Sequence, residues 1–244
     1  MNEIPRGHRE PEQNDRIIWN YDFSISTFYG CELQALLPLL PDGNLTLAEA
    51  IPGIGLINLT AVNFRAGGLD GLLPEFQELI LSVGVTPDLS RNVPSFAMYV
   101  VSIASTCELH LEHCRDYYKL PAHTLLSEVS VDREKLQIAL ANERGPIASL
   151  KSCAEYKEYS TEPQERLIQA FTGNQPIYSS DCIFRARVQE NQLAGGDGDV
   201  GLLHRHPFFG DLAVDDLELI PFVQMISDPD VIAEQYYYRS LPWK

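Results

Sequence analysis

Runs of alternating apolar and polar residues recur along most of this 244-residue chain, and they constrain its fold more than any other feature. The runs are rich in β-branched and aromatic residues and cover residues 54–64, 76–87, 95–106, 129–142, 182–193, 199–209 and 217–227. A period of two is typical of strands that bury one face, and glycine-containing turn signals separate the runs. The pattern predicts a mainly β fold with a few helices (α+β), built as a closed or double-layered antiparallel sheet.

Three segments have the spacing of short helices. Residues 30–40 place leucines at helical intervals before Pro38, which ends the pattern. Residues 229–239 begin with a proline, which is favourable in the first turn of a helix. A shorter helix is expected at 162–171. We therefore expect helix at these three places and strand through most of the remaining chain.

The chain gives no sign of a second folded domain. Its length suits one large domain, and neither an internal repeat nor a break in composition divides it. Residues 1–20 are mostly polar, and we expect them to form a flexible N-terminal arm. We assign residues 21–244 to a single domain.

The chain is acidic, with 34 Asp and Glu against 18 Lys and Arg and a net charge of −16. Such a charge repels phosphate groups, so we expect no nucleic-acid partner and no anionic membrane partner. No apolar run is long enough for a transmembrane helix, and the polar start lacks the apolar core of a signal peptide. The five cysteines, an odd number, then indicate free thiols in a cytoplasmic protein.

Five segments, in this order, resemble segments of the acetoacetate decarboxylase-like superfamily. They are YDFSISTFYGCELQALLPLLPDG (21–43), FQELILSVGV (76–85), CRDYYKLPAH (114–123), DREKLQIALAN (132–142) and GLLHRHPFFGDLAVDDL (201–217). The resemblance covers most of the chain from Tyr21 onward. It implies the fold of that superfamily, a double-layered antiparallel β cone or barrel.

The third of these segments departs from the superfamily at the position of its catalytic amine. In the superfamily, a lysine after the proline forms a Schiff base with a keto acid, and a second lysine lowers the pKa of the first. Here Pro121 is followed by Ala122 and His123. A second glutamate of the superfamily corresponds to Thr60 or Asn63. The resemblance therefore implies a divergent member without the Schiff-base lysine.

Three residues are candidates for catalysis. Glu78 corresponds to the superfamily's active-site glutamate, and its strand phase places it on an inward, apolar face, where a carboxylate is costly unless paired or used. His123 could act as an acid or base near neutral pH, or bond a backbone carbonyl at a strand end. Arg115 could recognise a carboxylate, or form a structural pair with Glu78 or Asp116.

Four further residues are candidates for substrate binding. Lys119 stands three positions before Ala122, an odd separation that points it to the opposite face of a strand and away from a pocket there. His204 and His206 would share one strand face, near the pocket mouth that the resemblance implies. Ser26 occupies the position of the superfamily's early arginine, which helps to receive the substrate.

The segment CELHLEHC (107–114) holds four potential zinc ligands, Cys107, His110, His113 and Cys114. On a strand, Cys107 and His113 would share one face while the other two residues share the opposite face. The four side chains could not then converge on one ion. We therefore expect neither a metal site nor a cofactor.

These features favour an enzyme that acts on a keto- or enol-type small molecule, such as a polyketide-like biosynthetic intermediate, by acid/base rather than Schiff-base chemistry. Cyclisation, dehydration, isomerisation or imine-free decarboxylation would fit, and these are lyase, cyclase or isomerase activities. Two alternatives stay open, a non-catalytic protein that binds a small molecule and a decarboxylase that uses Lys119 as a displaced amine. The aromatic tail at 234–244 suits a contact between subunits, so we expect a homo-oligomer.

Overall fold

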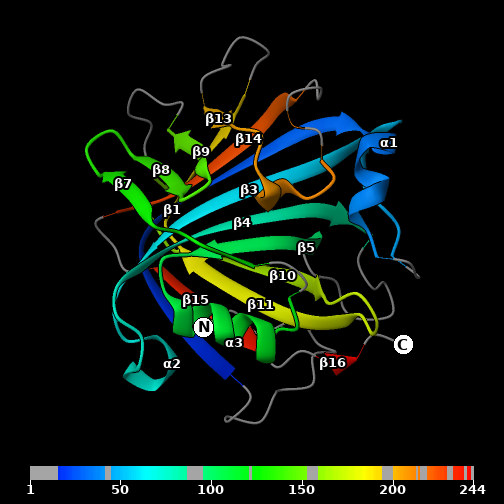
Figure 1. Ribbon diagram of the computed structural model, residues 1–244. Coiled ribbons are helices and arrows are strands. Elements are labelled where there is room, and N and C mark those ends of the chain that lie inside the picture. Colours follow the sequence, from blue (N-terminus) through cyan, green and yellow to red (C-terminus); the bar gives the residue numbers. More distant parts are fainter. Residues whose placement is uncertain are drawn as a thin grey trace.

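The computed structural model describes residues 16–41, 45–86, 96–120, 123–152, 159–193, 200–212, 214, 219–229, 233–238 and 241–242, and strands dominate them (Figure 1). The strands are β1 (Arg16–Glu32), β2 (Glu49–Ile51), β3 (Ile54–Phe64), β4 (Phe76–Val85), β5 (Phe96–Ser105), β6 (His123–Leu125), β7 (Glu128–Asp132), β8 (Gln137–Asn142), β9 (Gly145–Lys151), β10 (Gln164–Thr172), β11 (Tyr178–Ala186), β12 (Val188–Gln192), β13 (Gly201–Leu203), β14 (Ile220–Ser227), β15 (Ala233–Tyr238) and β16 (Leu241–Pro242). The described helices are α1 (Leu33–Leu36), α2 (Gly68–Gly71) and α3 (Glu108–Asp116), with 3-10 turns η2 (Leu37–Leu39) and η3 (Pro207–Phe209).

Seven strands close into a barrel. Their order is β1, β15, β11, β10, β5, β4 and β3, and β3 pairs with β1 to complete the circle. β10 and β5 run parallel, whereas the other neighbouring pairs of the barrel are antiparallel. Closure gives each barrel strand a partner on both sides, and this fixes which side chains point inward.

β1 is long enough to pair with two strands along one edge. Its first part pairs with β15 from Arg16 to Tyr21, and its second part pairs with β14 from Ile25 to Gly30. Its register with β3 shifts between Tyr21 and Phe23, which marks a bulge. The extra residue reverses the direction of the side chains, so that Tyr21 packs inside the barrel and Phe23 packs outside it.

A second, four-stranded sheet covers part of the outside of the barrel, in the order β13, β9, β8, β7. Outward side chains of β1, β3 and β4 pack against it in one hydrophobic cluster. Buried members of this cluster include Phe23, Ile25, Leu59, Leu81, Ile138, Leu140 and Ile147. Burial of apolar faces between two sheets gives the double-layered β architecture that the sequence predicts.

α3 covers part of the barrel interior with one face. Its buried residues are His110, Leu111 and Cys114, and the last two pack in a second hydrophobic cluster with inward side chains such as Trp19 and Phe76. The ring of His110 lies 4.5 Å from that of Phe76, measured between ring centroids. The helix thus carries polar side chains into an apolar interior.

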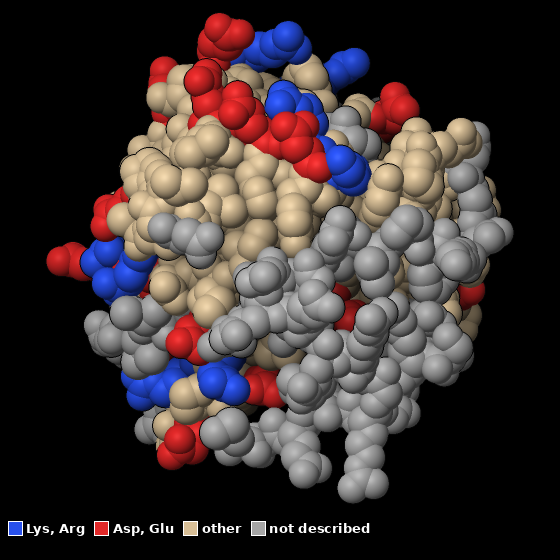
Figure 2. Space-filling view, turned by 90° about the horizontal axis from the view of Figure 1, so that it is seen from below, with Lys and Arg blue, Asp and Glu red and all other residues tan. Residues whose placement is uncertain are grey.

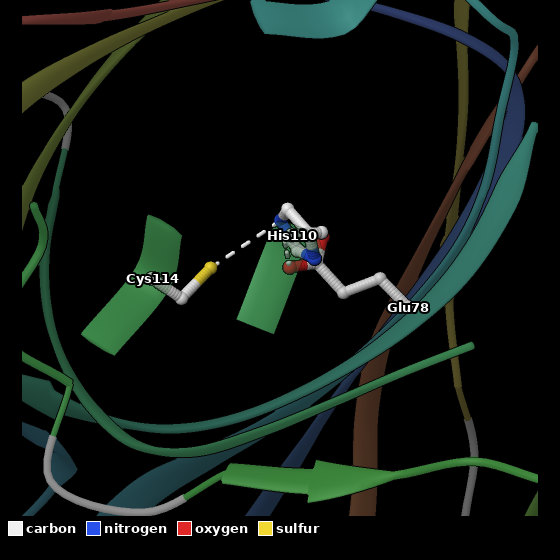
Figure 3. A group of neighbouring side chains, drawn as sticks. All are labelled: Glu78, His110 and Cys114. Atoms are coloured by element: carbon white, nitrogen blue, oxygen red, sulfur yellow. Dashed lines mark hydrogen bonds and ion pairs between the residues drawn. The ribbon is translucent and has the colours of Figure 1, made fainter. Parts of the chain in front are cut away.

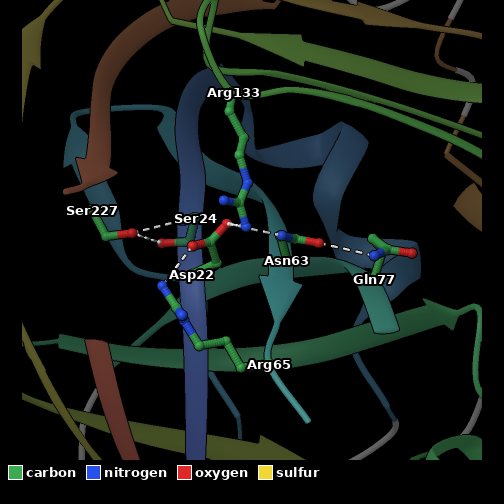
Figure 4. A network of polar contacts seen from close by, with 7 residues as sticks. All are labelled: Asp22, Ser24, Asn63, Arg65, Gln77, Arg133 and Ser227. Carbon is green, nitrogen blue, oxygen red and sulfur yellow. Dashed lines mark hydrogen bonds and ion pairs between the residues drawn. The ribbon is translucent and has the colours of Figure 1, made fainter. Parts of the chain in front are cut away.

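A buried carboxylate ties the second sheet to the barrel (Figure 4). Asp22 lies at the bulge of β1, and its side chain is only 1% exposed. Arg65 donates to it at 2.8 Å and Asn63 at 3.1 Å. Arg133, from the turn between β7 and β8, forms a further ion pair with it. These donors satisfy a carboxylate that would otherwise be costly to bury.

The strand predictions are confirmed in most places, but two helix predictions are wrong. β10 and β15 replace the helices expected at 162–171 and 229–239. Both strands complete the barrel, and this long-range pairing overrides the local helix propensity of their sequences. The helix expected at 30–40 is reduced to α1 and η2, because β1 continues to Glu32. The strand expected at 199–209 narrows to β13, followed by η3.

The described part of the chain begins at Arg16, which is also the first residue of β1. This strand therefore starts within the segment 1–20 that is expected to form an arm. Residues 1–15 lie outside the described residues, so a flexible arm there stays a prediction. The assignment of residues 21–244 to one domain likewise stays a prediction.

The surface charge is mixed on the face shown in Figure 2. Acidic and basic side chains lie beside one another there, and large areas carry neither. The net charge of −16 is therefore not gathered into one acidic patch on the described part of this face. None of the described helices is long and apolar enough to cross a membrane.

The Asp22→Asn substitution tests the buried carboxylate. It removes the charge and turns an amide donor toward groups that are donors themselves, so we expect the free energy of unfolding to fall by about 1–3 kcal/mol. Urea unfolding followed by tryptophan fluorescence measures this, with Asp211→Asn at an exposed position as the control. An unchanged midpoint for Asp22→Asn, or an equal loss in the control, would contradict the role given to Asp22.

Candidate functional site

The barrel interior holds a cavity of about 100 Å³. Its lining comes mainly from the inward faces of barrel strands, with a few residues of β12 and β14, and it is mostly apolar. The apolar residues include Phe28, Ile80, Phe96, Met98, Val100, Ile168, Ala170 and Phe184. Because pockets for drug-sized ligands have volumes of about 300–1,000 Å³, this cavity admits only a compact molecule.

One wall of this cavity carries four small polar side chains, Ser26, Asn58, Thr60 and Ser82. The amide nitrogen of Asn58 donates to Ser26 Oγ at 2.9 Å, and Ser26 Oγ lies 2.7 Å from Thr60 Oγ1. The amide oxygen of Asn58 accepts from Thr60 at 2.9 Å and from Ser82 at 3.4 Å. This network is uncharged and holds its own hydroxyl groups in place, so it could orient a carbonyl or hydroxyl group of a ligand.

Arg166 on β10 brings a positive charge to the same cavity. Its guanidinium group donates to Gln164 at 2.8 Å, to Glu190 at 2.9 Å and to the sulfur of Met225 at 2.8 Å. A thioether is a weak acceptor, and the Glu190 side chain is 46% exposed, which weakens an ion pair. A carboxylate in the cavity could therefore compete for Arg166.

A smaller cavity of about 40 Å³ lies beside the first, and Glu78, His110 and Cys114 lie together in its wall (Figure 3). His110 Nε2 is 3.3 Å from Cys114 Sγ and 3.5 Å from Glu78 Oε1. All three residues are buried, with 5% or less of each exposed. Ile80 and Val100 line both cavities, so the two adjoin, but Glu78, His110 and Cys114 line only the smaller one.

β4 and α3 bring the three side chains of the cluster together. Glu78 is in phase with Phe76 and Ile80 on the inward face of β4, as the alternation of that strand predicts. His110 and Cys114 stand four residues apart on α3, a separation that places them on one face of a helix. That face turns toward the barrel interior, where it meets the carboxyl group of Glu78.

Burial keeps this cluster uncharged near pH 7. It raises the pKa of Glu78 to about 8 and lowers the pKa of His110 to about 3, with His113 adding to the second shift. Burial also raises the pKa of the Cys114 thiol well above its usual value, with a smaller effect from Glu78. The contact between Glu78 and His110 is therefore one between a neutral carboxyl group and a neutral ring, not an ion pair.

The same three residues could hold a metal ion, because their ligand atoms all lie within 4.8 Å of one another. Cysteine, histidine and glutamate are all ligands of zinc. His110 and Cys114 belong to segment 107–114, for which the sequence predicts no convergence because it reads as a strand. That premise is wrong, since the segment forms α3, and the third ligand comes from β4.

No protein-family model and no curated protein sequence matches the chain. Solved structures match its fold. An acetoacetate decarboxylase-like enzyme from Sphingomonas wittichii RW1 aligns with a TM-score of 0.57 and 12% identity, over 100% of this chain and 98% of that chain. Acetoacetate decarboxylase from Legionella pneumophila aligns with a TM-score of 0.59 and 12% identity, over 100% and 92%. This chain has the acetoacetate decarboxylase-like fold.

A third match of the acetoacetate decarboxylase-like fold is the enduracididine biosynthesis enzyme MppR. Its structure in complex with the condensation product of pyruvate and imidazole 4-carboxaldehyde has a TM-score of 0.54 and 12% identity, over 97% of this chain and 95% of that chain. At such low identity the likeness concerns the fold alone. The predicted fold is therefore confirmed, and the chemistry has to be argued from the residues of this chain.

Two predicted site residues lie outside the barrel of this acetoacetate decarboxylase-like fold. His123, exposed on β6, and His206, buried ahead of η3, both line an open pocket of about 570 Å³. Asn142, at the end of β8, and Arg144, in the turn before β9, line it too. The structure thus brings His123 and His206 together but does not bring either of them to the cavities that contain Glu78 and Ser26.

Arg115 and Lys119 lie on the surface near the C-terminal end of α3. Arg115 pairs with Asp116 at 2.8 Å, which is one of the two structural pairs expected, and it does not contact Glu78. Lys119 is exposed, in keeping with its expected direction, and its amine donates to the backbone oxygen of Asp116. Neither residue lines the interior cavities.

The remaining predicted positions give less information. His204 is half-buried in the loop after β13, and the strand face that it was expected to share with His206 does not form, because β13 ends at Leu203. Pro121 and Ala122 lie outside the described residues. The nearest described residue before them, Leu120, lines the smaller cavity beside Glu78.

The sequence reasoning missed that His110 and Cys114 would meet Glu78, and it did not consider Arg166. The signal for the first was present in the four-residue spacing of His110 and Cys114. Alternating leucines at 109 and 111 hid it, because they imitate a strand. Arg166 was hidden because its strand was expected to be a helix.

The ring of His206 provides a pH-dependent contribution to stability. Its Nδ1 accepts from the backbone of Phe208 and its Nε2 lies 3.0 Å from Asn142 Oδ1, a pattern that requires the neutral ring. Burial, with Arg144 nearby, lowers the pKa of His206 from its usual 6.5. Below that pH the unfolded chain binds a proton that the folded chain does not, so stability falls as the pH falls.

Urea midpoints at about pH 7.5 and about pH 5.5, on either side of the ordinary histidine pKa, test this contribution. We expect a smaller loss of stability at the lower pH in His206→Gln than in the wild type. His204→Gln is the matched control and should keep the wild-type pH dependence. An equal pH dependence in wild type and His206→Gln would contradict the assignment.

Proposed function

We propose that this protein is an enzyme that acts on a small keto or enol compound inside the barrel, by acid/base chemistry without a Schiff base. The observation that carries the proposal is the Glu78 carboxyl group, buried in the wall of the smaller cavity, which adjoins the larger one. In its ionised form, Glu78 would take the proton from the carbon next to the carbonyl group and return it to the enolate at the end of the reaction. Enolisation of this kind is common to the cyclisation, dehydration and isomerisation reactions that the sequence favours.

The lining of the cavities supports chemistry without an imine. Of the described residues that line the two interior cavities, none is a lysine. Lys119 is the lysine that a displaced Schiff base would require. It is exposed, and its amine donates to a backbone oxygen. The resemblance of segment 114–123 implies that Ala122 stands where the superfamily has its catalytic amine. A decarboxylase that uses Lys119 is therefore the weaker alternative.

The substrate class is supported by the size and polarity of the larger cavity. A volume of about 100 Å³ suits a compact compound rather than a long one. The neutral cluster of Ser26, Asn58 and Thr60 could bond a carbonyl or hydroxyl group, while Arg166 could receive a carboxylate. A fold neighbour, MppR, is described in complex with a pyruvate-derived compound, which fits this class.

Hydrogen–deuterium exchange tests the proposal without knowledge of the natural substrate. Pyruvate and acetoacetate are incubated with the protein in D₂O, and loss of the proton signal next to the carbonyl group is followed by NMR. We expect the wild type to accelerate this exchange. We expect Glu78→Gln to reduce the acceleration by about 10²–10⁴-fold, the usual contribution of a general acid or base.

Glu75→Gln is the matched control for this experiment, because Glu75 is exposed and three residues away on the same segment. It should exchange at the wild-type rate. Wild-type exchange by Glu78→Gln would contradict the role of Glu78. Saturable binding of pyruvate with no acceleration by the wild type would contradict catalysis and favour the alternative of a non-catalytic binding protein.

A further inference from the structure

We propose that Glu78, His110 and Cys114 form a zinc site in the smaller cavity, with one coordination position open to that cavity. A zinc site goes beyond the proposed function, because acid/base chemistry by a carboxyl group needs no cation. The inference rests on the proposed function only for the kind of molecule that would meet the ion. The existence of the site can be tested independently of any reaction.

The distances within the cluster suit a tetrahedral ion. With bonds of about 2.0–2.3 Å to nitrogen, oxygen and sulfur, two ligands of a tetrahedral zinc ion lie about 3.3–3.6 Å apart. His110 Nε2 is 3.3 Å from Cys114 Sγ and 3.5 Å from Glu78 Oε1. All three ligand atoms lie within 4.8 Å of one another, so at most a small shift of one side chain would bring them to a common ion.

Hydrogen bonding alone does not satisfy this cluster. His110 Nε2 offers either one proton or one lone pair, yet it faces both the carboxyl group of Glu78 and the thiol of Cys114. The other ring nitrogen, Nδ1, has no hydrogen-bond partner among the described residues, and an ion bound at Nε2 would not change this. A cation between the three side chains would instead interact with all of them at once.

Charge balance also favours a divalent cation. A glutamate, a thiolate and a neutral imidazole together carry two negative charges, which a divalent ion neutralises. A neutral complex costs much less to bury than an unpaired carboxylate, and Glu78 is buried in a largely apolar interior. A mixed set of sulfur, nitrogen and oxygen ligands suits zinc, whereas magnesium and calcium prefer oxygen alone.

The surroundings correspond to an open site rather than a structural one. Structural zinc sites have four protein ligands, whereas catalytic sites have three and leave a position for water or substrate. Here three side chains border a cavity of about 40 Å³. Ser180 lines the same cavity, is 2% exposed, and has a hydroxyl group without a partner among the described residues.

A zinc ion at this place would provide the stabilisation that an amine provides in Schiff-base enzymes. As a Lewis acid it would polarise the carbonyl oxygen of a keto compound that reaches it from the adjoining cavity, and it would stabilise the enolate. The carbonyl oxygen would take the open position. Glu78 would hold the ion through one carboxylate oxygen, and its other oxygen would transfer the proton.

Metal analysis of the whole chain tests the site. The wild type is stripped with a chelator, dialysed, titrated with zinc and measured by elemental mass spectrometry. We expect about one tightly bound zinc ion per chain, as three converging ligands provide. Cobalt in place of zinc should give the absorption band of a cobalt–thiolate bond.

Cys114→Ser should lose this band and weaken zinc binding by at least about tenfold, because even residues that only support a ligand typically contribute that much. Cys107→Ser is the matched control, since Cys107 precedes α3 and lies outside the cluster. It should bind zinc as the wild type does. His110→Ala gives a second test if Cys114→Ser does not fold.

Failure of this inference can be told apart from failure of the proposed function. A wild type that binds no zinc, or a Cys107→Ser variant that loses zinc as Cys114→Ser does, would overturn the site. Deuterium exchange that persists in the stripped protein would overturn its role in enolisation while leaving Glu78 as the acid/base group. Tight zinc binding lost in Cys114→Ser supports the site, even if neither pyruvate nor acetoacetate exchanges.

Discussion

The pairing of β1 with β3 on one edge and with β15 on the other closes the sheet, and the rest of the structure depends on this closure. A closed sheet has a fixed inside, so each barrel strand must direct alternate side chains into it. The bulge between Tyr21 and Phe23 lets one strand serve both the interior cluster and the outer layer. Asp22, at that bulge, holds the hairpin of the outer sheet through Arg133.

The sequence predicts the fold well wherever alternation alone decides it. The run at 54–64 is β3 from end to end, and the phase of Glu78 on β4 correctly places it inside the barrel. The prediction fails where long-range pairing decides. The sequence QERLIQAFT of β10 has good helix formers but is held as a strand between β5 and β11. A single sequence contains no signal for that pairing.

The candidate site also combines a feature that local alternation predicts with contacts that depend on long-range packing. That Glu78 points inward follows from its own strand, but its partners come from a segment whose alternating leucines imitate a strand and which folds as α3. His110 and Cys114 therefore reach Glu78 only through the packing of a helix on the barrel. We propose that, within this acetoacetate decarboxylase-like fold, the groups beside Glu78 rather than an amine stabilise enolate charge, because the resemblance places Ala122 at the position of the superfamily's lysine.

The central claim is that a keto compound is held in the barrel without a covalent bond to an amine. Intact-mass spectrometry after borohydride reduction in the presence of pyruvate tests it most directly, because reduction makes an imine permanent. The account predicts that the mass of the protein does not change, under conditions in which NMR shows that pyruvate is bound. A mass increase of one reduced pyruvate, mapped to Lys119 or to any other lysine, would contradict it.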